Sequence, residues 1–214
     1  MNKNERFVIT INRELGSGGR TVGRKLAERM GVEYYDKAVI KGLQEKFNLT
    51  IEEIEKLKGH KYGWWASFKR QMTGSVVSSN MYIPRVANEA DKLNTHKVFQ
   101  AETEILKGIA ADESCIVAGR SGFFVFRDHP NHLSILIQAS LPSRVARLVR
   151  KQGISEDEAR KTIEQVDEMR ENYVQEFTKT SRYDTRNYQL VISMDHMTED
   201  AAVDIIMDYI NKQS

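Results

Sequence analysis

The residues best suited to chemistry in this chain form a glycine-rich turn, Gly16-Ser17-Gly18-Gly19-Arg20-Thr21. A short apolar, β-branched segment, 7–12, precedes the turn, and apolar residues then recur at helical spacing from 21 to 30. Strand, turn and helix N-terminus together make an anion site, because glycines let backbone N–H groups turn inward and the helix start has unpaired donors. The pattern predicts a phosphate-binding loop. The alternative is a glycine-rich turn that binds nothing.

This turn departs from the standard phosphate-loop pattern G-x-x-x-x-G-K-[ST] at two positions. When the pattern is laid over 14–21, Gly19 and Thr21 match, but Glu14 replaces the first glycine and Arg20 replaces the lysine. Arginine keeps the positive charge and can bind phosphate through two N–H groups at once. We therefore expect Arg20 to be the phosphate-binding cation and the Thr21 hydroxyl to be a ligand of Mg²⁺.

Four further apolar segments predict the rest of a sheet: 32–35, 114–118, 133–137 and 188–194. Helical periodicity predicts helices over 98–111, 142–151, 155–177 and 198–211, and Ser155 with Glu158 has the spacing of a capping box. Asp36 is suited to cap a helix that runs to Phe47. Five strands alternating with helices predict a single α/β domain, with helices on both faces of a parallel sheet.

Two segments interrupt this regular alternation. We interpret 48–95 as a helical insert on the acceptor side, since from about 60 to 95 aromatic residues are mixed with glycine, serine and Pro84. Trp64 and Trp65 lie there near basic residues; a core contact of the insert or an oligomer contact is the favoured interpretation, and a base-stacking surface is the alternative. The segment 148–157, broken by Gly153, is predicted to be a small lid.

Composition narrows the class of protein. The 214 residues carry a formal net charge of +2, which gives no global bias towards nucleic acid or anionic lipid. The single cysteine, Cys115, lies in an apolar run and is predicted to be a buried thiol. No apolar stretch approaches the length of a membrane span and the N-terminus does not resemble a signal peptide, so we expect a cytoplasmic protein. A homo-oligomer is compatible with these observations.

Several segments, taken in order, resemble the cytidylate kinase-like family of P-loop kinases. The glycine-rich turn leads to a helix that ends Leu26-Ala27-Glu28-Arg29-Met30-Gly31, and 34–36 follow. The segment 117–122 is similar to the family's strand-end D-G-R motif, 134–147 to its arginine-bearing lid entry, and 164–170 to its lid-exit helix. The likeness covers about 7–212, apart from 48–95.

The resemblance implies the three-layer P-loop kinase fold with strand order 2-3-1-4-5. It also implies transfer of a phosphoryl group from ATP, with Mg²⁺, to a nucleoside monophosphate such as CMP. The residues that would bind ATP are Gly16, Ser17, Gly18, Gly19, Arg20, Thr21 and Arg144. Those that would bind the acceptor are Asp36, Arg120 and Asp167. Those that would act on the transferring group are Arg20, Arg120, Arg147 and Arg170.

The departures from the family pattern leave other functions open. Ala118 stands where the D-G-R motif has its aspartate. Together with Arg20 it favours a second hypothesis, a non-catalytic nucleotide-binding or regulatory protein on the same fold. A third is a kinase for a non-nucleotide small molecule. The site residues have plain structural interpretations too: Asp36 as a helix cap, Arg144 and Arg147 as exposed ion pairs, and Asp167 with Arg170 as a helix-face salt bridge.

Overall fold

The computed structural model describes residues 1–37, 39–40 and 89–213, without the side chains of 89–95. The helix predicted to run to Phe47 therefore lies mostly outside the described residues, and so does most of the insert predicted over 48–95. Two helical elements of the described part, α6 (Gly122–Val125) and the 3-10 turn η1 (Thr185–Asn187), were not predicted, because they are single turns without measurable periodicity.

Five strands form one sheet, β1 (Val8–Arg13), β2 (Glu33–Tyr35), β3 (Cys115–Ala118), β4 (His132–Gln138) and β5 (Leu190–Ser193). Their order is β2-β3-β1-β4-β5, and every neighbouring pair is parallel. The predicted α/β class and strand order are thus confirmed. Strands β1, β3 and β4 are nearly continuous apolar runs because both of their faces are covered.

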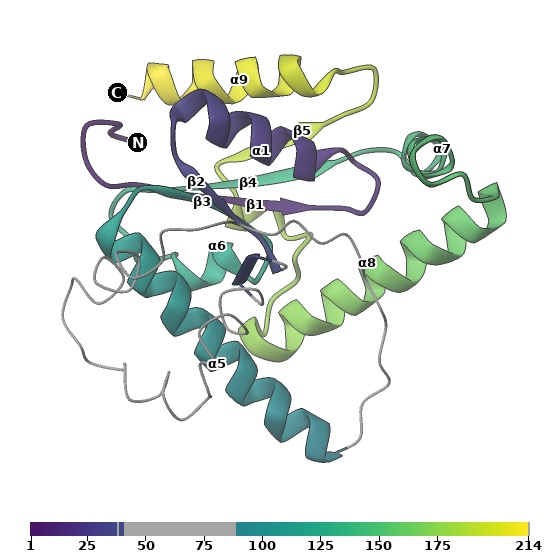
Figure 1. The fold of residues 1–214 in the computed structure, drawn as a ribbon, viewed down its shortest axis with the longest axis horizontal. Coiled ribbons are helices and arrows are strands. Elements are labelled where there is room, and N and C mark those ends of the chain that lie inside the picture. Colours follow the sequence, from purple (N-terminus) through teal and green to yellow (C-terminus); the bar gives the residue numbers. More distant parts are fainter. Residues whose placement is uncertain (38, 41–88, 214) are drawn as a thin grey trace, which may run out of the picture.

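Helices cover the two faces of the sheet, as Figure 1 shows. Helices α1 (Gly19–Met30) and α9 (Glu199–Lys212) lie on one face, and α5 (Glu89–Asp112), α6 (Gly122–Val125) and α8 (Glu156–Thr178) on the other. Alternate side chains of β1 enter the two resulting cores: Ile9 and Ile11 pack with α1 and α9, and Val8 packs with α5. In open α/β sheets of this kind, ligands bind at the carboxyl ends of the strands.

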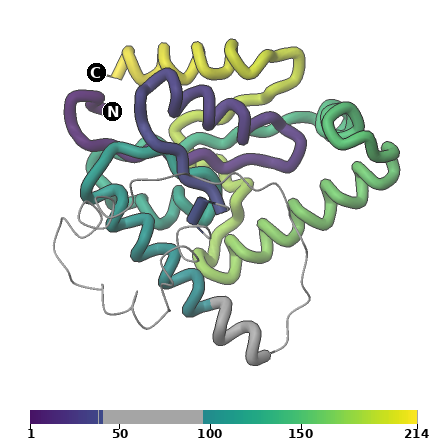
Figure 2. Tube along the Cα trace, in the orientation of Figure 1, coloured from purple at the N-terminus to yellow at the C-terminus, as the bar shows by residue number. Residues whose placement is uncertain are grey.

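Most predicted elements are present, with small shifts at their ends. The clearest difference is α5, which begins at Glu89 and not at Val98. The residues from 89 to 97 hold no glycine or proline that would end a helix, but they have no strong apolar periodicity either. The two ends of the chain lie side by side (Figure 2), where the terminal amine of Met1 donates to Gln213 at 3.2 Å.

The predicted caps are confirmed. Asp36 accepts a hydrogen bond from the backbone N–H of Val39 at 3.2 Å, and Ser155 and Glu158 form the full capping box of α8. Gly153 ends α7 (Leu141–Gln152) in the left-handed conformation. The predicted lid segment, 148–157, is therefore the tip of a hairpin formed by α7 and α8.

This hairpin has an apolar cluster of its own, formed by Val145, Leu148, Ala159 and Ile163. Leu15, which directly precedes the glycine-rich turn, packs against the same cluster. Apolar contact thus joins the hairpin to the predicted phosphate loop.

Cys115 provides a test of the fold. Its side chain is fully buried at the start of β3, and burial raises the pKa of its thiol to about 12. Because the thiolate is the reactive form, we expect dithiodipyridine to label the folded protein at least about a hundredfold more slowly than the protein in denaturant. Labelling is followed by absorbance. Similar rates in the two states would contradict the placement of Cys115.

Candidate functional site

The glycine-rich turn has the backbone of an anion-binding loop. Gly16 and Gly18 have φ of 83° and 88°, a left-handed region that favours glycine, and α1 begins at Gly19. In the described part of the chain, the backbone N–H groups of Gly16 and Gly18 have no hydrogen-bond acceptor. Unpaired N–H donors at a helix N-terminus are the groups that bind phosphate in other proteins.

Neighbouring side chains and backbone crowd this loop, so it has no room for larger residues. A Cβ atom on Gly16 would lie 2.8 Å from the carbonyl oxygen of Arg144. On Gly18 it would lie 3.1 Å from the guanidinium carbon of Arg147, and on Gly19 2.7 Å from the Cβ atom of Arg13. Three arginines from two elements therefore lie directly against the loop.

Arg20 reaches from the start of α1 to the end of β2. Its guanidinium forms an ion pair with the buried carboxylate of Asp36 at 3.1 Å. The contact joins a residue predicted to bind ATP to one predicted to bind the acceptor. It also gives Asp36 a role beyond capping, since the same carboxylate accepts the Val39 N–H.

Among the described carboxylates at the carboxyl ends of the strands, Asp167 on α8 has the most partners. It is buried, and its Oδ1 accepts the backbone N–H of Leu15 at 3.1 Å. Arg144 of α7 also pairs with it, and the guanidiniums of Arg170 and Arg182 lie 3.4 Å from Oδ1. The predicted i,i+3 salt bridge with Arg170 is present, but it is one part of a network that holds the loop.

Arg182 was not predicted to be a functional residue. Its side chain is fully buried, and it donates to the backbone carbonyl of Arg13, which Arg170 also approaches at 3.2 Å. The Tyr188 hydroxyl donates to the carbonyl of Arg182 at 2.7 Å and so fixes the segment after α8. No sequence pattern distinguishes such a buried arginine from a surface one, because its partners are distant in the chain.

Arg120 occupies the end of β3 in a strained backbone. Gly119, Arg120 and Ser121 have φ of 77°, 54° and 52°, which is unusual for the two non-glycine residues. The Arg120 guanidinium pairs with Glu102 of α5, donates to the Tyr173 hydroxyl at 2.8 Å and lies 4.8 Å from the centre of that ring. Burial lowers the pKa of Arg120.

Arg147, also on α7, lies against the loop at Gly18. It pairs with Glu199 in the first turn of α9, with both side chains mostly buried. Partial burial raises the pKa of Glu199, but the hydrogen bond from Arg147, a backbone hydrogen bond and the charges of Arg147 and Lys151 together leave that pKa below its ordinary value. Thus all five predicted arginines form ion pairs at the carboxyl ends of the strands: Arg20, Arg120, Arg144, Arg147 and Arg170.

The hydroxyl of Thr21 fits a limited role in binding Mg²⁺. Among the described residues there is no group of three or more His, Cys, Asp or Glu side chains that could hold a metal. Mg²⁺ commonly takes one or two protein ligands and completes its shell with substrate phosphates and water. A single hydroxyl at the helix start is compatible with that kind of binding and not with a site made of protein ligands alone.

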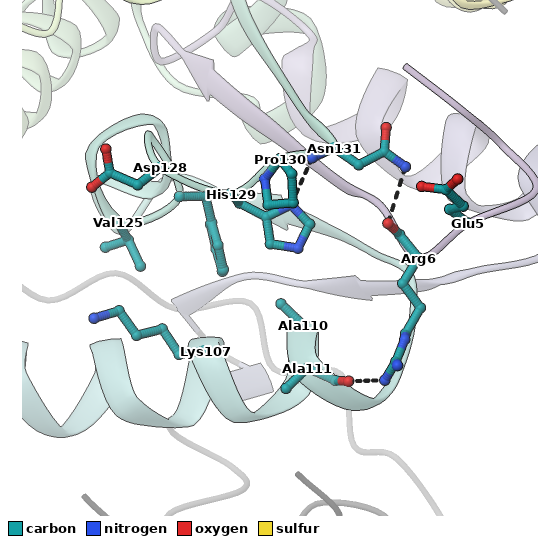
Figure 3. A pocket seen from close by; sticks show the side chains of 11 residues that line it. Glu5, Arg6, Lys107, Ala110, Ala111, Val125, Asp128, His129, Pro130 and Asn131 are labelled. Atoms are coloured by element: carbon teal, nitrogen blue, oxygen red, sulfur yellow. Dashed lines mark hydrogen bonds between the residues drawn. The ribbon is translucent and has the colours of Figure 1, made fainter. Parts of the chain in front are cut away.

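A hollow at the opposite end of the sheet, shown in Figure 3, is separate from this site. Its lining includes Arg6 before β1, Lys107 on α5 and His129 before β4. Open α/β sheets bind ligands at the carboxyl ends of their strands, and this hollow lies at the amino ends. We therefore assign no ligand to it.

A five-stranded parallel sheet of order 2-3-1-4-5 with a glycine-rich loop between its first strand and helix defines the P-loop kinase class. The model of the cytidylate kinase-like family matches residues 8–196, and the chain belongs to that family. A cytidylate kinase from Methanopyrus kandleri is 24% identical over 208 residues, which are 93% of this chain and 90% of the relative.

Two solved structures share the fold. An uncharacterized protein from Eubacterium ventriosum superposes with a TM-score of 0.70 at 22% identity, covering 97% of this chain and 99% of that one. Shikimate kinase from Bacteroides thetaiotaomicron gives a TM-score of 0.52 at 15% identity, covering 96% and 98%. No helix in the described part of the chain has the length and apolar character to cross a membrane.

The crowding around Gly16 gives a testable prediction. Gly16→Ala introduces a side chain at positive φ, which costs about 1–2 kcal/mol, and also brings Cβ against Arg144. We expect a larger loss of unfolding free energy than this, and at least about tenfold weaker ATP binding. Urea unfolding and titration calorimetry measure the two effects.

Gly31→Ala is the matched control, because Gly31 also has positive φ but a Cβ atom added there would have no other atom within 4 Å. This variant should lose only the free energy of the strained backbone and bind ATP like the parent. Equal losses in the two variants would show that the loop is not crowded as described.

Proposed function

We propose that this protein transfers a phosphoryl group from ATP to a small acceptor, a nucleoside monophosphate such as CMP. Kinase-type phosphoryl transfer is the chemistry that the family and the fold support. The observation that carries the proposal is that the N–H groups of Gly16 and Gly18, just before α1 and among arginines, have no acceptor among the described residues. Phosphoryl transfer needs chiefly positioning and positive charge around the moving group, and this edge provides both.

The donor would bind across the turn. In this proposal the phosphates of ATP accept N–H groups from 16–21, and the Thr21 hydroxyl binds Mg²⁺, which would neutralise phosphate charge. Arg147, whose guanidinium lies against Gly18, approaches the loop from α7. Arg144 would support the loop by donating to the Leu15 carbonyl at 3.4 Å.

The acceptor would bind between the ends of β2 and β3. Arg120 would contact its phosphate, and Asp36 with Arg20 would face it from the β2 side. Asp167 was expected to contact the acceptor directly. Since its carboxylate already accepts from the Leu15 N–H and from arginines, we now propose that it positions the loop.

The tip of the α7–α8 hairpin, 148–157, would act as the lid in this mechanism. Arg144, Arg147 and Arg170 all come from the two helices of the hairpin. A shift of the hairpin would therefore move three cations relative to the loop together, and closure would exclude water from the transferring group.

A second candidate function is nucleotide binding without transfer. It is favoured by Ala118, which places no carboxylate at the end of β3, and by the ion pairs that already engage Arg20 and Arg120. In that case these arginines would be structural, and the loop would bind nucleotide as a regulatory ligand.

Turnover with an acceptor panel separates the two candidates. We expect the protein with ATP and Mg²⁺ to release ADP when CMP is added, and to form the acceptor's phosphorylated product, as detected by ³¹P NMR. The panel includes dCMP, UMP, AMP and shikimate. ADP release on a non-nucleotide acceptor alone would exclude a nucleoside monophosphate. Tight ATP binding with no turnover on any acceptor would support the second candidate.

A further inference from the structure

Arg13, the last residue of β1, differs from the other arginines of this edge. Six of them pair with a carboxylate: Arg20, Arg120, Arg144, Arg147, Arg170 and Arg182. Within the described part of the chain, the guanidinium of Arg13 has no hydrogen bond and no ion pair. It is nevertheless half-buried, and a buried cation is normally paired.

The Arg13 side chain makes close contacts at both of its ends. Its stem packs on Gly19, where a Cβ atom would lie 2.7 Å from Arg13 Cβ. Its Nη1 atom lies against Gly119, so closely that a side chain there would collide with it. The backbone is held as well, because the carbonyl of Arg13 accepts from Arg170 and Arg182.

These contacts place the Arg13 guanidinium between two predicted subsites. Gly19 belongs to the loop expected to bind ATP, and Gly119 directly precedes Arg120 at the expected acceptor end. The surroundings make the charge costly. Burial lowers the pKa of Arg13, and so do the neighbouring charges of Arg182 and Arg20, whereas Tyr34 and Asp36 raise it. A dianionic group bound there would remove that cost.

We propose that Arg13 is a binding residue for the phosphoryl group that passes between donor and acceptor. Its guanidinium would bind two phosphate oxygens through its planar pair of N–H groups. This proposal rests on the proposed function for the identity of the ligand, but it predicts an anion site in any case. It also explains why an arginine occurs where a small residue would suffice to end the strand.

The test uses three variants of the full chain. Arg13→Met removes the charge and keeps the stem on Gly19, and Arg13→Lys keeps the charge but loses the planar pair of donors. Arg127→Met is the control, because Arg127 is 60% exposed and lies after α6, towards the amino end of β4. Titration calorimetry measures binding of inorganic tripolyphosphate and of ATP, and a thermal melt without ligand measures stability.

We expect Arg13→Met to weaken the binding of both ligands by about ten- to hundredfold, the range for one charge-assisted contact. Arg13→Lys should fall between Arg13→Met and the parent, and Arg127→Met should match the parent. Without ligand, the melting temperature of Arg13→Met should equal or exceed that of the parent, because an unpaired buried charge is removed. Such a gain is not expected of a structural residue.

Parental affinity of Arg13→Met for tripolyphosphate would overturn the proposal, and so would a parent that binds neither ligand. If Arg13→Met does not fold, Arg13→Lys decides, since parental affinity there would exclude binding through two N–H groups. Binding that depends on Arg13 without turnover on any acceptor would refute the proposed kinase activity but keep the anion site. Turnover by the parent, with unchanged binding in Arg13→Met, would keep the proposed kinase activity but refute the anion site at Arg13.

Discussion

The carboxylate of Asp167 is the constraint on which this edge of the molecule depends. It joins the backbone of the loop, at the Leu15 N–H, to side chains from α7, from α8 and from the segment after α8. A buried cation that loses its partner costs about 3–5 kcal/mol, and Asp167 is the shared partner of three arginines. The loop, the hairpin and the segment around Arg182 are therefore held in one arrangement, and a change at one affects the others.

The same arrangement explains how so many arginines can gather at one place. Four carboxylates pair with six of them: Glu102 on α5, Asp167 on α8, Glu199 on α9 and Asp36 after β2. Mutual repulsion is thereby reduced before any ligand binds. Arg13 lacks such a partner in the described chain, and the single charge of Asp167 is shared by three arginines. Two of these, Arg170 and Arg182, donate to the Arg13 carbonyl, so positive charge remains where β1 ends. In our proposal, this end of the sheet binds a phosphate without the lysine of the standard loop.

Much of this organisation can be predicted from the sequence, and the rest cannot for identifiable reasons. The strands were predictable because a parallel sheet buried on both faces gives apolar runs, and the loop because glycine is favoured at positive φ. The partners of the arginines were not predictable, since Glu102 and Glu199 lie 18 and 52 positions from Arg120 and Arg147 in the chain. Arg182 and Arg13 carry no local signal at all, because their burial is decided by distant elements.

The most direct measurement of the central claim is a crystal structure of the protein grown with ADP and Mg²⁺. The account predicts density for the two phosphates against the backbone N–H groups of 16–21, with an oxygen of the terminal phosphate within hydrogen-bonding distance of the loop and its arginines. A well-ordered loop with no phosphate in it, and ADP bound elsewhere on the molecule, would contradict the account.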